Sequence, residues 1–226
     1  MKKVLSLVLM LILIMVVAGG CSKSTAPTST DAAKEFKLGD LSDSKPLFVN
    51  KEKKEVQYLA QVNGKYFTEP TRHGIVFKDG TNGEKSVLRG MANQNDFYNA
   101  LVEIGAKPGN NISLDDMKTG EKSVQGSKLN VFVTWDGLGK EIPFSDILKQ
   151  SEKRPMDIRF GGNLENATNL KTGCILCLDS CAVGITSDAA FKANEITLKK
   201  QVNITGNGEV LPKDGTKIAV IFRLAE

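Results

Sequence analysis

Histidine is nearly absent from this chain of 226 residues, because His73 is the only one. A single imidazole excludes sites built from several histidine ligands. A Ser-His-Asp mechanism is also disfavoured, since the sequence marks no nucleophile that would lie beside this one base. His73 enters an apolar run as Thr71-Arg72-His73-Gly74-Ile75. We interpret it as a structural residue at or near the surface, with a role as a fourth metal ligand as the alternative.

Aromatic residues are also scarce, at 6% of the chain, and the arginines form no cluster. The formal net charge is +4, with acidic and basic residues interspersed. This composition is typical of an ordinary solvated surface, whereas nucleic-acid binding requires a basic stripe or a recognisable motif. We therefore expect no nucleic-acid partner.

The N-terminal apolar stretch is too short for a comfortable membrane span. Val4 to Ala18 carries no charged residue and follows Lys2-Lys3. A transmembrane helix needs roughly 20 apolar residues, more than this stretch provides. A positive start followed by a short apolar run predicts a secretory signal peptide over residues 1–20.

Small residues stand directly before the first cysteine, as Ala18-Gly19-Gly20-Cys21. This pattern resembles the lipobox of bacterial lipoproteins, with Ala18 where that pattern prefers leucine. The resemblance implies cleavage before Cys21 and attachment of a diacylglycerol to its sulfur, often with a further acyl chain such as palmitate. Two acyl chains hold a protein stably to a bilayer. We therefore expect a lipid-anchored protein on the extracytoplasmic face of the cell membrane, with that membrane as its partner.

The rest of the chain divides by composition into a tether and a domain. Residues 21–45 combine the lipidated cysteine with a stretch rich in Ser, Thr, Ala and Pro, which predicts a flexible linker. Residues 46–226 have the length of a single domain.

Alternation of apolar and polar residues predicts strands in most of this domain. Strands are expected at 56–62, 65–68, 74–78, 85–88, 129–135, 140–144, 157–160, 196–198 and 218–224, the last at the centre of a sheet. One clear helix is expected near 94–104, where Phe97, Leu101 and Ile104 share a face, with Asn93 or Asn95 as its cap and Gly105 at its end. The fold class is therefore α+β: a β-rich domain, sandwich-like or a mixed antiparallel sheet, with one main helix.

Three cysteines within eight residues carry most of the chemical content: Cys174, Cys177 and Cys181. Once Cys21 is lipidated, three thiols are an odd number, so they cannot all pair within one chain. In a strand over 174–178, Cys174 and Cys177 would point to opposite faces with Cα atoms about 10 Å apart. That separation excludes a disulfide. Cys177 and Cys181 would then be the better-placed pair, since Asp179-Ser180 can bend the chain between them.

Three interpretations of this segment stay open. The thiolates could bind a metal centre, either an iron–sulfur cluster, which usually takes four cysteines, or zinc with Asp179 or His73 as the fourth ligand. Two of the cysteines could form a redox-active disulfide, with the third as a resolving or partner thiol. All three could instead be small buried residues that pack a strand.

Several stretches resemble the YdjY-like family of exported proteins: Glu55 to Val62, Asp96 to Gly109, Thr134-Trp135, Phe160 to Gly162, and Thr172-Gly173. The resemblance covers roughly residues 50–192, and the helix with its Gly-Ala-Lys-Pro-Gly exit is its most specific part. It implies the fold and export. Some members carry a ferredoxin-type iron–sulfur label, and this chain has three of the four cysteines that a full motif needs.

These observations lead to one main expectation and two alternatives. We expect a non-enzymatic, membrane-tethered lipoprotein whose Cys174, Cys177 and Cys181 bind a metal or iron–sulfur centre, with electron transfer to a membrane partner as one use of that centre. The alternatives are a thiol–disulfide redox protein, and a binding or structural module whose cysteines are merely packed.

Overall fold

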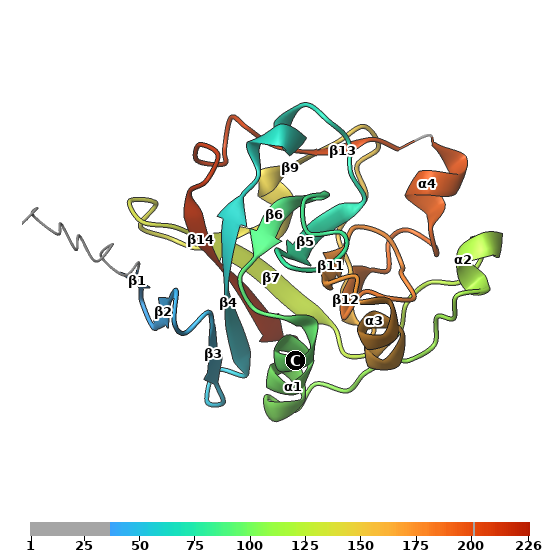
Figure 1. Cartoon of the computed structure of the whole chain (residues 1–226), viewed down its shortest axis with the longest axis horizontal. Helices are drawn as coiled ribbons and strands as arrows, with labels where there is room; N and C mark the ends of the chain where they lie inside the picture. The colour runs from blue at the N-terminus through green and yellow to red at the C-terminus, as the bar shows by residue number, and fades with distance from the viewer. Residues whose placement is uncertain (1–36, 201) are drawn as a thin grey trace, which may run out of the picture. The chain divides into compact units, whose positions relative to one another are not determined.

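The computed structural model describes residues 37–200 and 202–226 (Figure 1). The predicted signal peptide over residues 1–20 and the predicted lipidation site Cys21 lie outside the described residues. Within the described ranges, no helix combines the length and the apolar character needed to cross a membrane.

Strands dominate the described part of the chain. The strands are β1 (Lys37–Leu38), β2 (Leu41–Ser42), β3 (Leu47–Asn50), β4 (Glu55–Val62), β5 (His73–Phe77), β6 (Ser86–Gly90), β7 (Leu129–Thr134), β8 (Ile142–Pro143), β9 (Leu148–Gln150), β10 (Ile158–Phe160), β11 (Cys174–Cys177), β12 (Thr186–Asp188), β13 (Ile204–Gly206) and β14 (Lys217–Leu224). The helices are α1 (Gln94–Glu103), α2 (Asp116–Thr119), α3 (Leu164–Leu170) and α4 (Glu195–Lys199), with short 3-10 helices η1 (Gly64–Phe67) and η2 (Phe144–Ile147). The predicted α+β, β-rich class is confirmed.

One large mixed sheet organises the domain. Its strands follow the order β10-β12-β11-β5-β6-β4-β14-β7-β8, and β3 pairs with β4 at the end that β6 does not cover. Most neighbours run antiparallel, but the β5–β6 and β11–β12 pairs are parallel. The near-continuous apolar strand β14 lies between β4 and β7, as its composition predicted.

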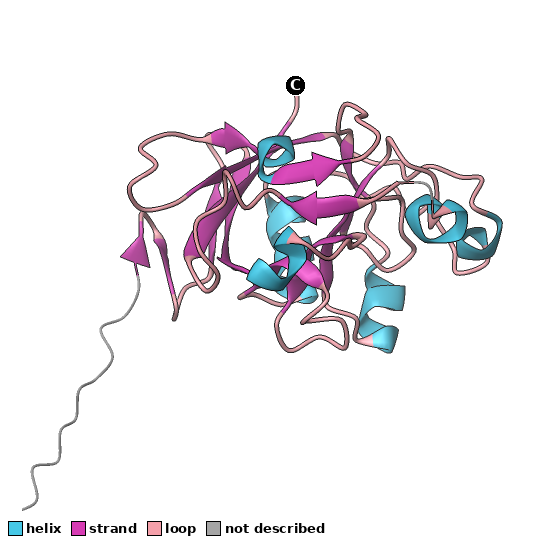
Figure 2. Cartoon of the chain, turned by 90° about the horizontal axis from the view of Figure 1, so that it is seen from above, coloured by secondary structure: helices cyan, strands magenta, loops and turns pink. Residues whose placement is uncertain are grey.

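The sheet curls until its β10 end returns to the start of β7. Figures 1 and 2 show from two directions that the strands do not lie in one flat layer. A backbone bridge joins Lys128 to Arg159 of β10. The Phe160 N–H also donates to the Ser127 carbonyl at 2.9 Å. Two ends of the sheet that are far apart in strand order are therefore held side by side.

The main helix α1 packs its apolar face into the core of this curled sheet. Asn93 caps its start, because its side-chain oxygen accepts from the N–H groups of Asn95 and Asp96. Gly105, with a φ of +88°, follows its C-terminal end. The Phe97 ring lies 5.4 Å from that of Tyr58 on β4 and 4.7 Å from that of Phe222 on β14. The predicted helix near 94–104 is confirmed.

Two predicted strands are wrong. Residues 65–68 do not return as a hairpin partner, because the chain enters η1 instead and the Gly64 N–H donates to the Asp214 carboxylate at 2.8 Å. Residues 196–198 lie in α4, where Glu195 and Ile196 are buried. A stretch of three residues is too short to show whether its apolar residues repeat with the period of a strand or of a helix.

The segment that was predicted as linker ends in residues that contact the domain. β1 and β2 form a small antiparallel pair over residues 37–42. Leu41 is buried and packs with Leu59 of β4 and Ala219 of β14. The outer face of the central strands is therefore covered in part by chain that precedes residue 46.

Candidate metal centre

Strands β5 and β11 are neighbours, and both are irregular where they pair. Cys174 lies opposite Val76, Leu176 opposite Ile75, and Cys177 opposite His73. Between these pairs each strand advances by one extra residue, Ile175 in β11 and Gly74 in β5. Such bulges break the alternation of side chains along a strand.

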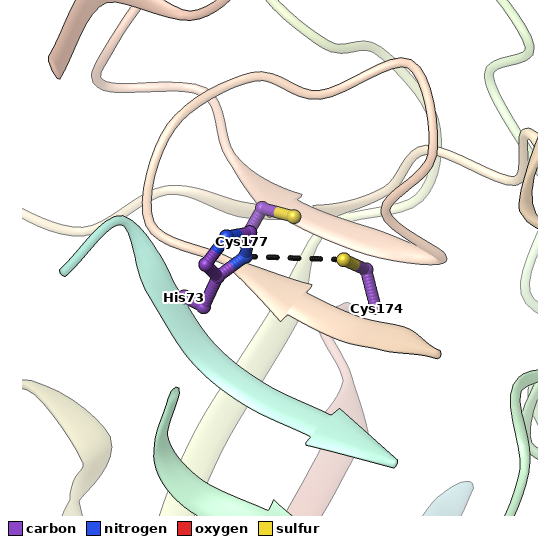
Figure 3. Close-up of side chains that lie close together, drawn as sticks. All are labelled: His73, Cys174 and Cys177. Carbon is purple, nitrogen blue, oxygen red and sulfur yellow. Dashed lines mark hydrogen bonds between the residues drawn. The ribbon is translucent and has the colours of Figure 1, made fainter. Parts of the chain in front are cut away.

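The bulges bring three donor atoms to one place. His73, Cys174 and Cys177 each offer a ligand atom, and these atoms all lie within 4.8 Å of one another (Figure 3). Cys174 Sγ and His73 Nδ1 form a hydrogen bond of 3.8 Å. Our inference that Cys174 and Cys177 would point to opposite faces is therefore wrong, because it assumed an unbroken strand.

Burial separates the thiols from the imidazole. Cys174 and Cys177 have no exposed surface, and Cys181 has 1%. His73 is only half-buried, at the start of β5, so it forms the more solvent-accessible part of the cluster. The three cysteines and Val76 make a small core of their own, with Met117 and Val183 packed against it.

The three thiols form a hydrogen-bonded chain with Cys177 in the middle. The hydrogen bond with Cys177 lowers the pKa of the Cys174 thiol well below its usual value, and His73 adds to this effect against the cost of burial. The bond with Cys177 also lowers the pKa of Cys181, whereas the pKa of Cys177 is raised by its bonds to both neighbours and by burial. The thiols of Cys174 and Cys181 therefore lose a proton more readily than the thiol of Cys177.

A buried ion pair lies beside the thiols and fixes the loop after β11. The Arg72 guanidinium donates two hydrogen bonds to Oδ1 of Asp179, whose side chain is fully buried. The Ile196 N–H donates to the other carboxylate oxygen at 3.3 Å. Burial raises the pKa of Asp179, and the Arg72 charge opposes that rise. Burial lowers the pKa of Arg72, but the charge and hydrogen bonds of Asp179, with a smaller contribution from Cys181, together outweigh burial and raise that pKa above its usual value.

The loop that carries Cys181 is held from the side of α3 as well. The Asn163 side chain donates to the Cys181 carbonyl at 2.9 Å, and the Asn166 side chain donates to the Ala182 carbonyl at 3.1 Å. The Ala182 N–H contacts the Met117 sulfur at 3.3 Å. The backbone around Cys181 is therefore fixed by contacts that do not involve the thiols.

Sequence comparison now places this arrangement in a known family. Residues 47–223 match the YdjY domain. The chain is also 44% identical over 196 residues to the uncharacterized protein YdjY of Escherichia coli (strain K12), which covers 87% of this chain and 86% of that protein. The chain belongs to the YdjY family. No solved structure matches it significantly.

In this YdjY domain the structure brings together most of the residues that the sequence singled out. His73 takes the place that we gave it as the alternative, beside Cys174 and Cys177. Asp179, the other suggested fourth ligand, is instead engaged by Arg72 and the Ile196 N–H. Cys181 contacts Cys177 but lies outside the three-residue group. The group of His73, Cys174 and Cys177 could hold a metal ion.

Several residues around the thiols were not found by sequence reasoning. The Asn82 side chain approaches Cys174 Sγ at 4.0 Å, and Arg72, Ser187 and Gly184 also border the YdjY-domain cluster. None of them forms a recognisable spacing with the cysteines. The position of Arg72 next to His73 was the one available signal, and it became meaningful only when β5 was placed against β11.

Proposed function

We propose that this protein is an exported, lipid-anchored metal-binding protein whose centre is formed by His73, Cys174 and Cys177, with Cys181 as the nearest further ligand. The observation that carries the proposal is the convergence within 4.8 Å of an imidazole and two thiols from strands about 100 residues apart in sequence. Thiolate and imidazole are the ligands that zinc prefers in closed structural sites.

The short distances between the three donor atoms favour a single metal ion over a [4Fe–4S] cluster. Two sulfurs on one tetrahedral zinc, with Zn–S bonds of about 2.3 Å, lie about 3.8 Å apart. A limit of 4.8 Å between all three donor atoms fits that arrangement. In a [4Fe–4S] cluster each cysteine binds a different iron atom, so its cysteine sulfurs lie further apart. A mononuclear thiophilic ion, with zinc as the first candidate, is therefore the cofactor we propose.

The anchoring part of the proposal rests on the first 21 residues. The positive start, the short apolar run and the small residues before Cys21 support export and lipidation. Mass spectrometry of the membrane fraction should find the N-terminal peptide beginning at an acylated Cys21. A chain that retains residues 1–20, or a Cys21→Ala variant that stays equally membrane-bound, would refute the anchor.

Metal analysis tests the centre. The full chain, purified without oxygen in detergent, should carry about one metal ion, and Cys177→Ser should lose it. Val76→Ala is a matched control, because Val76 packs against the same cysteines but offers no ligand atom. Equal metal content in Cys177→Ser and the wild type would overturn the proposal. Visible absorbance with sulfide and more than one iron per chain would replace the single ion by an iron–sulfur cluster.

A second candidate, a thiol–disulfide redox protein, is favoured by one observation. Cys177 is hydrogen-bonded to both other thiols, so either neighbour could be its disulfide partner. A catalytic thiol also needs partial exposure, whereas all three cysteines are buried. Reduction of insulin by the metal-free protein would support this candidate, and its absence would count against it.

A further inference from the structure

Ser187 carries a hydroxyl that has no hydrogen-bond partner. The residue has no exposed surface, and Ser187 Oγ is one of the few buried side-chain oxygens left unpaired in the described part of the chain. Leaving a buried hydroxyl unpaired destabilises the folded state. The Ser187 hydroxyl would therefore gain a hydrogen bond from any acceptor that forms beside it in another state of the protein.

The register of the sheet places Ser187 beside a thiol of the candidate centre. β11 and β12 are parallel neighbours, and Cys177 is the direct partner of Ser187. Partners in adjacent strands project their side chains from the same face of the sheet. The hydroxyl and the Cys177 thiol, the latter drawn in Figure 3, therefore lie on one side of the sheet.

Gly184 leaves open the space that these two groups share. A methyl group on Gly184 would lie 2.7 Å from Ser187 Oγ and 3.0 Å from Cys177 Sγ. Both contacts are too close for a side chain, so only glycine fits without displacing one of the two atoms. The thiol and the hydroxyl thus border a common volume that carries no side chain of its own.

The chemistry of sulfur supplies the missing acceptor. A neutral thiol accepts hydrogen bonds weakly, whereas a thiolate accepts them strongly, and a metal ligand must be a thiolate. We propose that Ser187 is a positioning residue of the metal centre, whose hydroxyl donates a hydrogen bond to the Cys177 thiolate that forms when the metal binds. This inference rests on the proposed metal-binding function and adds a residue that fixes how strongly the centre binds.

The proposal predicts opposite effects on stability and on affinity. Ser187→Ala removes an unpaired hydroxyl, so the metal-free protein should be at least as stable as the wild type in chemical denaturation. The same change removes a donor to the metal-bound thiolate, so zinc affinity should fall about tenfold, as for other groups that support metal ligands. If Ser187 had only a structural role, its replacement by alanine would not lower zinc affinity while leaving the stability of the metal-free protein intact.

Thr186→Val is the matched control. Thr186 neighbours Ser187 on the same strand, but its hydroxyl already donates to the Ile175 carbonyl at 2.7 Å. Its loss should lower the stability of the metal-free protein and leave zinc affinity unchanged. Ser187→Thr, which keeps the hydroxyl, should retain wild-type affinity, so that a loss found in Ser187→Ala alone is assigned to the hydroxyl.

The experiment is a competition for zinc between a chromogenic chelator and the full chain in detergent, reduced and without oxygen. A weaker Ser187→Ala with unaffected Ser187→Thr and Thr186→Val would support the inference. Equal zinc affinity of Ser187→Ala and wild type would overturn it while leaving the metal centre intact. A wild-type chain that takes no zinc from the chelator, and whose Cys177→Ser variant behaves identically, would overturn the proposed function and this inference together.

Discussion

At the scale of single residues, the buried carboxyl of Asp188 sets a pH dependence of stability. Burial raises its pKa from 3.8 to about 6, although the N–H groups of Asp157 and Ala190 donate to it. The folded state therefore binds a proton more tightly than the unfolded state, and the free energy of unfolding should fall as pH rises from about 4 to about 6.

Asp188→Asn tests this dependence. The amide keeps the Oδ1 acceptor but cannot ionise, so at pH 7.5 the variant should be more stable than the wild type by about 3 kcal/mol. Below about pH 4 the two proteins should be equally stable, because Asp188 is then protonated in both states. Urea titrations at several pH values measure the difference, and a difference that does not change with pH would contradict the assignment.

The Arg72–Asp179 pair is the second residue-scale feature with a measurable effect. Asp179 is fully buried, so Asp179→Ala leaves the largely buried Arg72 guanidinium without its counter-charge. Removing one partner of a buried pair typically destabilises a protein by about 3–5 kcal/mol. Arg223, paired with Glu55 and Glu141, provides a more exposed comparison. Chemical denaturation should show a clearly smaller loss for Glu141→Ala than for Asp179→Ala.

At the scale of elements, α1 depends on its N-terminal cap. Asn93→Ala removes the oxygen that accepts from two backbone N–H groups and should cost about 1 kcal/mol. Asn99 is exposed in the middle of the same helix, so Asn99→Ala should be neutral or slightly stabilising, because alanine is the better helix former. A loss of similar size at both positions in thermal unfolding would show that the cap is not the cause.

The elements also show how far the sequence could predict the structure. The strands with long alternation, the capped helix and the central β14 were all predicted correctly, since each presents one period over many residues. Residues 65–68 and 196–198 were wrong because short stretches are decided by tertiary contacts. The bulges at Gly74 and Ile175 leave no periodic pattern in the sequence. They break the alternation of side chains, which is why Cys174 and Cys177 face the same side.

The candidate site was predictable in the same partial way. The cysteine spacing marked Cys174 and Cys177, together with the neighbouring Cys181, but His73 stands about 100 positions earlier and was named only as an alternative. Ser187 and Gly184 gave no signal, because their relation to Cys177 depends on the parallel register of β11 and β12. Residues that support a metal ligand are its neighbours in three dimensions. Their positions along a single sequence show no regular spacing that would reveal this.

At the scale of the whole molecule, a metal at this centre would tie His73, in the first third of the chain, to Cys174 and Cys177 in its last third. A ligand that binds only the folded state stabilises it by about 2.7 kcal/mol at a free concentration 100 times its Kd. For a domain of this size that corresponds to a rise in Tm of roughly 5–10 °C. Differential scanning calorimetry with and without zinc should show the rise for the wild type and its absence for Cys177→Ser.

The curl of the sheet has a consequence for how copies of this protein meet one another. Exposed strand edges are templates for pairing with a neighbouring chain, which leads to aggregation. Here β10 folds back onto β7, and the terminal strand β8 has only two residues, of which Pro143 carries no N–H to donate. Proteins held to a membrane, as the proposed lipid anchor would hold this one, meet their neighbours more often than proteins free in solution. Because β10 is joined to β7 and the short edge strand β8 ends in proline, many copies could lie side by side without pairing their sheets.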